Sequence, residues 1–298
     1  MDGNFVRLSS RRSLAMIVAI VTSLAVLAAA SSALATPKGE YAVFSDCPLS
    51  HAELAACVFA QTESGKFIVG KKTVPIEKTI TLQGGFTENE SGELAFVGAA
   101  DGNTLSKTPQ NVPGGLAGLI NCKEISNFIE RIACELVFEN KLTGVSATTE
   151  LAAPASSIGL NELNLLNEEG TALSLPVKVH LENPFLGSSC YIGSNSAPII
   201  LELTTGTTSP PLPNKPIKGS AGTIGFAGEG GILVVSNNSL VNNSFAAPGT
   251  NGCGGIFSSI IDPLVNASLG IPSAAGTNTA VLNGTLKQSA TETVKEHE

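Results

Sequence analysis

The stretch Val177-Lys178-Val179-His180-Leu181-Glu182 decides the fold class, because apolar and polar residues alternate along it without a break. Successive side chains of a β-strand point to opposite faces of the sheet. Val177, Val179 and Leu181 therefore share one face, and His180 lies on the other. A strand with one apolar and one polar face is typical of an antiparallel sheet that covers a core on one side. The sequence predicts antiparallel β-structure here.

The rest of the chain reads mostly as strands and turns. Apolar runs at 79–82, 199–203 and 232–235 predict further strands. Proline cannot donate a hydrogen bond to a neighbouring strand, so the proline-rich residues 209–216 predict a loop or an edge crossing. Turns are predicted at Glu63-Ser64-Gly65-Lys66 and Asp101-Gly102-Asn103, and short helices at 50–56 and 125–132.

The composition supports a globular protein with a core. Of the 298 residues, 43% are hydrophobic and 14% are charged, which excludes a disordered chain. Glycine has no period of three and no heptad pattern occurs, which excludes collagen-like and coiled-coil chains. We therefore expect a mainly β fold of antiparallel β-sandwich or barrel units, with short helices and disulfides.

Residues 1–35 have the three parts of a secretory signal peptide. A head with three arginines precedes an apolar run over residues 14–30, and Ala33-Leu34-Ala35 fits the small-residue pattern before a cleavage site. The alternative is an uncleaved membrane anchor, since the run reaches the short end of a bilayer span. We expect a mature chain that begins at Thr36 and is secreted, either extracellular or associated with the cell wall.

The net charge of the chain restricts the classes of partner that it can bind. Without residues 1–35 the chain keeps 14 Lys and Arg against 24 Asp and Glu, and Arg131 is its one arginine. Nucleic-acid surfaces usually carry a basic stripe rich in arginine, and anionic membranes attract basic segments. We expect no nucleic acid as partner and no stable membrane insertion after signal cleavage. A cell-wall or protein ligand stays open.

The six cysteines are even in number, which favours three disulfides in an oxidising compartment. Zinc is the alternative, but no Cys-x-x-Cys pair occurs and the three histidines are scattered along the chain. We therefore expect no metal ligands among them. The predicted disulfide cysteines are Cys47, Cys57, Cys122, Cys134, Cys190 and Cys253.

The mature sequence also reads as two copies of one plan. After Cys47 and again after Cys190 the same landmarks follow in order: an apolar strand, a Pro-Ile pair, a Gly-Phe pair, a second apolar strand, a Pro-Gly pair and a cysteine. This order favours a diverged tandem duplication, although glycine and proline also recur by chance in β-proteins. The expected parts are a signal peptide (1–35), a first β-rich repeat (36–152), a linker or crossover (153–164), a second β-rich repeat (165–288) and a polar tail (289–298).

Helix geometry and the repeat together predict the disulfide pairing. Cys122 and Cys134 bracket the helix expected at 125–132, whose rise of ~1.5 Å per residue separates them by roughly 18 Å if the helix is continuous. A disulfide needs Cα atoms about 4.4–6.8 Å apart, although a break in the helix would allow a local bridge. The repeat supplies the other pairings. We expect the disulfides Cys190–Cys253, Cys47–Cys122 and Cys57–Cys134.

Several short phrases of the mature chain carry a resemblance. They are Val74-Pro75-Ile76 with Thr79-Ile80-Thr81-Leu82-Gln83-Gly84-Gly85, Asn183-Pro184-Phe185-Leu186-Gly187 followed by Cys190-Tyr191-Ile192-Gly193, and Ile261-Asp262-Pro263-Leu264-Val265-Asn266. In these phrases the chain resembles a family of uncharacterised secreted bacterial proteins. The resemblance implies export and supplies no functional residue.

Candidate catalytic residues are few. His180 lies on the polar face of its strand, where a solvated surface imidazole is the simplest interpretation and an acid–base role the alternative. No G-x-S-x-G motif of a serine hydrolase occurs. His51 reads as a local structural residue and His297 as part of the polar tail. Glutamates cluster in turns, and Asp101-Gly102-Asn103-Thr104 lacks the rest of a calcium loop.

Two functional hypotheses remain. The first is a secreted non-catalytic β-rich protein, either structural or a module that binds an apolar or protein partner at the cell wall or in the extracellular space. The second is a secreted hydrolase with a site near His180. We assign no catalytic residue, cofactor or metal site. The hypotheses differ in whether His180 converges with an Asp, Glu or Ser in one pocket.

Overall fold

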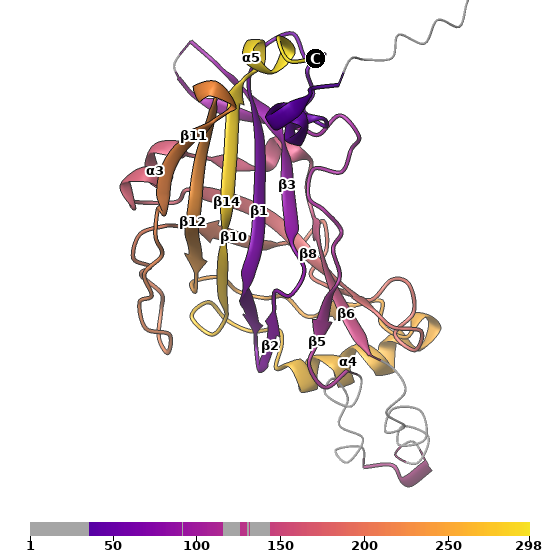
Figure 1. Cartoon of the computed structure of the whole chain (residues 1–298). Helices are drawn as coiled ribbons and strands as arrows, with labels where there is room; N and C mark the ends of the chain where they lie inside the picture. The colour runs from indigo at the N-terminus through magenta and orange to yellow at the C-terminus, as the bar shows by residue number, and fades with distance from the viewer. Residues whose placement is uncertain (1–35, 91, 116–125, 130, 132–143) are drawn as a thin grey trace, which may run out of the picture. The chain divides into compact units, whose positions relative to one another are not determined.

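Two seven-stranded antiparallel sheets, A and B, make up the fold (Figure 1). The computed structural model describes residues 36–90, 92–115, 126–129, 131 and 144–298. Sheet A has the order β11-β12-β14-β1-β3-β4, with β2 paired to β1. Its strands are β1 (Leu54–Val69), β2 (Lys72–Pro75), β3 (Ile80–Glu88), β4 (Leu94–Gly98), β11 (Thr223–Ala227), β12 (Ile232–Asn242) and β14 (Thr279–Ala290).

Sheet B has the order β13-β9-β8-β6-β5, with β7 and β10 also paired to β8. Its strands are β5 (Gln110–Val112), β6 (Val145–Leu151), β7 (Gly159–Leu160), β8 (Leu173–Glu182), β9 (Tyr191–Ile192), β10 (Ile199–Leu203) and β13 (Thr250–Asn251). Short helices connect the strands: α3 (Glu162–Asn167), α4 (Ser258–Leu269), α5 (Thr291–Lys295), η1 (Gly39–Phe44), η4 (Ala155–Ser157), η5 (Gly228–Gly230) and η6 (Gly255–Phe257).

The inner faces of the two sheets pack on each other and form the main core. Leu82 and Leu282 from sheet A lie in one buried cluster with Leu175, Val177 and Leu201 from sheet B. Strands β8 and β10 run across β12, β14 and β1 behind them (Figure 1), as in sheets that pack at a large angle. The predicted mainly β fold with antiparallel sheets is therefore confirmed.

The strand β8 follows the expected alternation. Val177 and Leu181 are each 2% exposed, and the intervening His180 lies on the opposite face. Predicted strands at 199–203 and 232–235 are confirmed by β10 and β12, and β3 begins at Ile80. Residues 209–216 form a loop.

Two local predictions are wrong. Glu63-Ser64-Gly65-Lys66 is not a turn: it lies inside β1, where the register with β14 shifts between Thr62 and Ser64 as in a β-bulge. Gly65 has φ of +128°, and an added Cβ would lie 1.9 Å from the Val281 carbonyl oxygen. Glycine at this position therefore allows β1 and β14 to approach closely. The helix expected at 50–56 is a turn that leads into β1, whose first residue is the buried Leu54.

Strands of both proposed repeats are interleaved. β1 from the first segment pairs with β14 from the second in sheet A, and β6 from the first pairs with β8 in sheet B. Pro37–Glu298 forms one compact unit. The duplication itself stays a prediction, because one of its key landmarks, Cys122, lies outside the described residues. The expected linker 153–164 contains η4 and β7 and begins α3.

The disulfide prediction is correct for one bond and wrong for another. Cys190 and Cys253 are bonded, as expected, with Cα atoms 4.0 Å apart. Cys47 is bonded to Cys57, with Cα atoms 5.6 Å apart, instead of to Cys122. Consecutive tight turns over 44–54 fold the chain back, so the nearest cysteine is in reach. Cys57 is therefore not available for Cys134, which, like Cys122, lies outside the described residues.

Of the remaining predictions, the signal peptide is not tested and the polar tail is wrong. The expected signal peptide 1–35 lies outside the described residues, as do residues 125, 130 and 132 of the helix expected at 125–132. Of that helix, Phe128, Ile129 and Arg131 have helical backbone. The polar tail 289–298 is folded: it ends β14 and forms α5, in which Val294 is fully buried.

Candidate functional site

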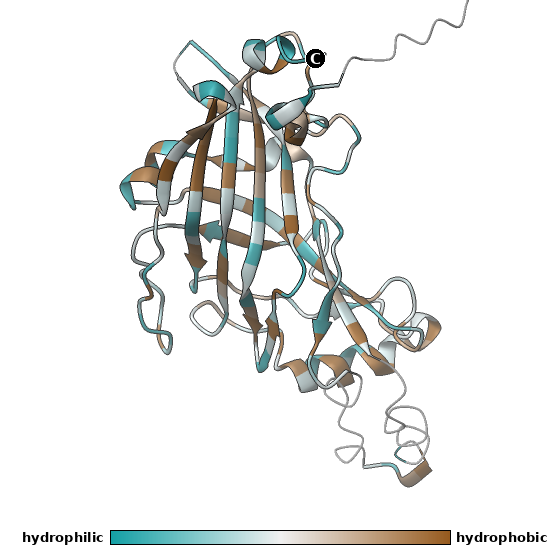
Figure 2. Cartoon of the chain, viewed as in Figure 1, coloured by the Kyte–Doolittle hydropathy of each residue, from teal (hydrophilic) through white to brown (hydrophobic). Residues whose placement is uncertain are grey.

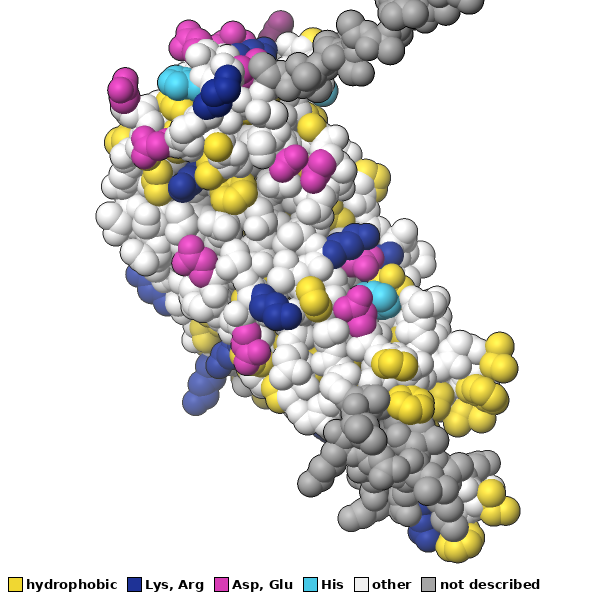
Figure 3. Space-filling view, turned by 45° about the vertical axis from the view of Figure 1, so that its right-hand side comes forward, with side chains coloured by type: hydrophobic (Ala, Val, Ile, Leu, Met, Phe, Trp, Pro, Cys, Tyr) yellow, Lys and Arg dark blue, Asp and Glu magenta, His cyan; other side chains and the backbone are white. Residues whose placement is uncertain are grey.

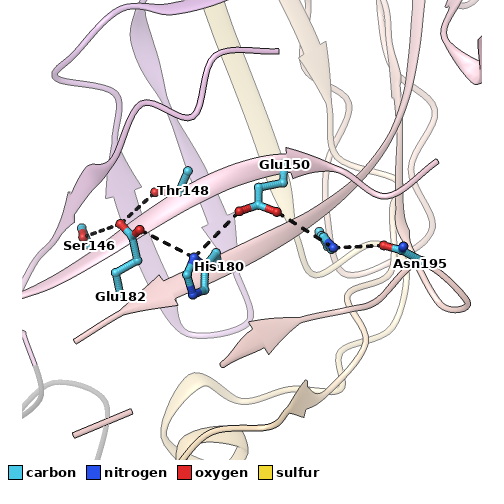
Figure 4. A network of polar contacts seen from close by, with 7 residues as sticks. Ser146, Thr148, Glu150, His180, Glu182 and Asn195 are labelled. Atoms are coloured by element: carbon cyan, nitrogen blue, oxygen red, sulfur yellow. Dashed lines mark hydrogen bonds and ion pairs between the residues drawn. The ribbon is translucent and has the colours of Figure 1, made fainter. Parts of the chain in front are cut away.

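The outer face of sheet B carries a cluster of polar side chains that the strand register brings together. His180 on β8 lies opposite Thr148 on β6 and Tyr191 on β9. Two residues further along β8, Glu182 lies opposite Ser146. Two residues before His180, Lys178 lies opposite Glu150. All of these side chains share one face because they differ by two positions along their strands. We call them, together with Asn195, the His180 cluster. Figure 4 shows its hydrogen bonds and ion pairs.

Two carboxylates face the imidazole. Nδ1 of His180 lies 3.6 Å from Glu182 Oε1 and 3.8 Å from Glu150 Oε1. The second oxygen of Glu182 accepts hydrogen bonds from the hydroxyls of Ser146 and Thr148, each 3.1 Å long. The His180 side chain is 15% exposed and Thr148 is buried. The expectation of a solvated surface imidazole is therefore wrong.

An aromatic ring and an ammonium group complete the cluster. The rings of His180 and Tyr191 stack with centroids 4.5 Å apart, and Lys178 Nζ lies 4.7 Å from the Tyr191 ring centroid. Lys178 also donates a 3.0 Å hydrogen bond to Asn195 and lies 3.9 Å from Glu150. Burial, with a smaller effect of the two nearby carboxylates, raises the pKa of Tyr191. The Tyr191 side chain is thus neutral, and it lies between the positively and negatively charged side chains of the His180 cluster.

The cluster meets only part of what a hydrolase requires. In a catalytic triad one imidazole nitrogen faces an acid and the other faces a nucleophilic hydroxyl. Here Nδ1 faces acids, but Nε2 of His180 is buried and has no hydrogen-bond partner among the described residues. The nearby hydroxyls of Ser146 and Thr148 donate to Glu182 instead. Figure 3 shows histidine, acidic and basic side chains side by side on the surface, where they form no continuous basic stripe.

The opposite face of sheet B borders two apolar cavities between the sheets. The first has a volume of about 80 Å³ and the second about 60 Å³. Four residues line both of them: Phe67 from β1, Thr149 from β6, Val177 from β8 and Leu201 from β10. The two cavities are therefore neighbours along the space between the sheets, separated by these shared side chains.

Aliphatic and aromatic side chains form most of the cavity walls. Leu82, Leu175 and Leu282 line the first, and Val179, Ile192 and Phe245 line the second. The polar residues of the walls are Gln61, Thr62, Thr149, Asn238 and Thr285 in the first cavity and Lys72, Gln110 and Thr149 in the second. Apolar cavities of this kind stay dry and accept apolar molecules.

A third, open groove of about 730 Å³ lies beside α3. Glu88, Glu93 and Glu162 line it. Burial raises the pKa of Glu162, a hydrogen bond from Gln288 opposes this shift, and the nearby charge of Glu88 adds to it. Oε1 of Glu162 has no hydrogen-bond partner among the described residues. Nothing in the spacing of these glutamates along the chain indicated that they would meet.

The remaining candidate residues have structural roles. Asp101 accepts a hydrogen bond from the amide of Asn103 and Thr104 accepts one from Ala99, so both close the predicted turn. His51 is exposed, and its amide donates to the Pro48 carbonyl in a turn. His297 stacks on Tyr41 with centroids 3.9 Å apart. Among the described residues, no three His, Cys, Asp or Glu side chains are grouped closely enough to hold a metal ion.

Comparison with known proteins adds no further assignment. No family model, no curated protein and no solved structure matches this chain. Within the described part of the chain, no helix combines the length and hydropathy needed to cross a membrane. The Cys47–Cys57 and Cys190–Cys253 disulfides indicate an oxidising environment.

Proposed function

We propose that this chain is a secreted, non-catalytic binding module that holds a small apolar molecule between its two sheets, at the cell wall or in the extracellular space. The observation that carries the proposal is the pair of neighbouring apolar cavities that share Phe67, Thr149, Val177 and Leu201. Close-packed interiors have few voids larger than a water molecule. Two adjacent cavities in one core are therefore a feature that a bound molecule would explain.

The cavity volumes restrict the ligand to a slender shape. A cavity of about 150 Å³ accepts benzene, whereas these two measure about 80 and 60 Å³. A compact ring fits neither one alone. An unbranched hydrocarbon chain can occupy both in sequence when the shared side chains of Phe67 and Leu201 turn aside. We therefore propose a ligand with a linear aliphatic segment.

Methyl NMR with 1-octanol as the probe tests this proposal. Saturable shifts are expected at the methyl groups of Val177 and Leu201, while benzene should cause much weaker ones. Ala60→Leu fills the first cavity and Ala147→Leu fills the second, and each should weaken octanol binding at least tenfold. Ala95→Leu, on an exposed position of β4, is the matched control. Absence of saturable shifts, or equal binding by the filled variants, would overturn the proposal.

The hydrolase is the second candidate, and one observation favours it: the imidazole of His180 meets the carboxylates of Glu150 and Glu182. The enclosed Nε2 and the hydroxyls bound to Glu182 weigh against it. Hydrolysis of p-nitrophenyl acetate by the native protein and by His180→Gln distinguishes the two candidates. We expect equal background rates, whereas a rate lost in the variant would favour the hydrolase.

A further inference from the structure

Strand β11 forms one edge of sheet A. It pairs with β12 on one side, and on its other side no strand of the described residues follows (Figure 1). Alternate residues of an edge strand present their amide and carbonyl groups outward, ready to pair with another strand. The five residues of β11 therefore offer a row of backbone hydrogen-bonding groups at the surface.

The usual protection of an edge strand is missing in β11. Natural edge strands carry charged residues, proline or a bulge that discourage pairing, but the sequence Thr223-Ile224-Gly225-Phe226-Ala227 has no charge and no proline, and its register with β12 is regular. Ile224 is 52% exposed and Phe226 is 70% exposed, on one face of the strand. Figure 2 shows β11 as strongly hydrophobic along the sheet edge.

We propose that β11 is an interface between two copies of this chain, which pair antiparallel about a two-fold axis at Gly225. In this register Gly225 lies opposite Gly225 of the second copy, and Ile224 lies opposite Phe226 of that copy. A β-branched residue opposite an aromatic residue is a favourable cross-strand pair, and the two-fold axis forms it twice. The strand is thus complementary to itself.

The charges that flank β11 agree with antiparallel self-pairing. The nearest charged residues are Lys218 before the strand and Glu229 after it. Antiparallel pairing brings the Glu229 end of one copy to the Lys218 end of the other, whereas parallel pairing would bring like charges together. Lys218 also forms a 3.0 Å ion pair with Glu168. Because only five residues pair, we expect a weak, concentration-dependent dimer, typical of interfaces below about 1,200 Å².

Sedimentation velocity over a concentration series tests the proposal. The native chain should convert from monomer to dimer in the micromolar range. Phe226→Lys should raise the dissociation constant at least tenfold, because each lysine then lies opposite Ile224 of the other copy and the two lysines are diagonal neighbours across the axis. Leu212→Lys is the matched control, since Leu212 is 88% exposed and lies in a loop away from β11. A chain that stays monomeric throughout, or a dimer unchanged by Phe226→Lys, would overturn the proposal.

Cysteine cross-linking tests the register independently. An added Cβ at Gly225 meets no atom within 4 Å, so Gly225→Cys should fold normally. Residues directly opposite in an antiparallel pair have Cα atoms about 4.5–5.5 Å apart, within disulfide range. Oxidised Gly225→Cys should therefore form a covalent dimer. Thr223→Cys should not, because its copies would lie roughly 13 Å apart along the strands. Equal cross-linking of both variants would contradict the register.

Discussion

The two faces of sheet B differ: the polar side chains of the outer face are mostly paired with one another, whereas the apolar side chains of the inner face leave space unfilled. On the outer face, the hydrogen bonds and ion pairs of the His180 cluster occupy most of the polar atoms that the strands present. On the inner face, Val177, Thr149 and Leu201 border space that no atom of the described residues fills. The same two strands, β6 and β8, supply both faces. A polar cluster in which only Nε2 of His180 keeps no partner among the described residues gains little from a ligand, whereas an underfilled apolar space gains stability from one.

The largest effect is expected from removing the Cys190–Cys253 disulfide, which supports both faces of sheet B. Cys190 lies next to Tyr191 of the His180 cluster, and it belongs to the core cluster below. Replacing Cys190 and Cys253 with alanine should lower the free energy of unfolding by about 4 kcal/mol, since the bond closes a long loop. Replacing Cys47 and Cys57 should cost about 3 kcal/mol, because their loop is shorter. Urea unfolding measures both, and the reverse order would contradict the loop argument.

A core truncation should have the next largest effect and act on the inner face alone. Leu201→Ala enlarges both cavities, so we expect a loss of about 3 kcal/mol. Ile200→Ala is the matched control, because Ile200 is the next residue on the same strand and is 44% exposed. Its loss should stay below about 1 kcal/mol. Equal losses in urea unfolding would show that the inner face is not the packed one.

One substitution applied to two adjacent residues compares the faces directly. Thr148→Val removes a buried hydroxyl that donates to Glu182, which should cost about 1 kcal/mol. Thr149→Val places a methyl group against the apolar cavities, so its effect should be neutral or stabilising. Urea unfolding of the two variants in parallel gives the sign of each change. The same sign and size for both would contradict the difference between the faces.

The smallest expected effect concerns Glu162, a partly buried carboxylate outside both faces. Its pKa is raised in the folded chain, so the folded state binds its proton more tightly than the unfolded state does. The contribution of Glu162 to the free energy of unfolding is therefore fully present below its unfolded pKa, and it falls and is lost as the pH rises through its folded pKa. Glu162→Gln should flatten this fall in unfolding curves recorded from about pH 4 to pH 8. Glu93→Gln, in the same groove, serves as the control.

Alternation in the sequence predicted which face of β8 is buried, but it did not indicate what lies opposite each residue. The partners of His180 come from β6 and β9, and only the register between strands decides that Thr148 and Tyr191 meet it. The cavities depend on side chains from both sheets, which no local pattern relates. The bulge between Thr62 and Ser64 resembles a turn in sequence, because the same small residues occur in both.

The pairing of Cys47 shows a different reason for failure. The internal similarity favours Cys122 as the partner of Cys47, whereas the short distance along the chain favours Cys57. Tight turns make that short distance usable. The pairing of Cys190 with Cys253 was predictable, because these are the two cysteines of the second half of the sequence.

The pairing of β1 with β14 also determines when this protein can fold. Ala56 pairs with Ala290, so the centre of sheet A joins the beginning and the end of the described chain. β3 can pair with β1 as soon as both are synthesised, but β12 and β1 lack their shared neighbour in the sheet until β14, the last strand, is available. Contacts so distant in sequence form slowly. Without β14, β1 and β12 each keep an unpaired edge at the centre of sheet A, so products truncated before β14 should aggregate or be cleaved by proteases more readily than the full chain.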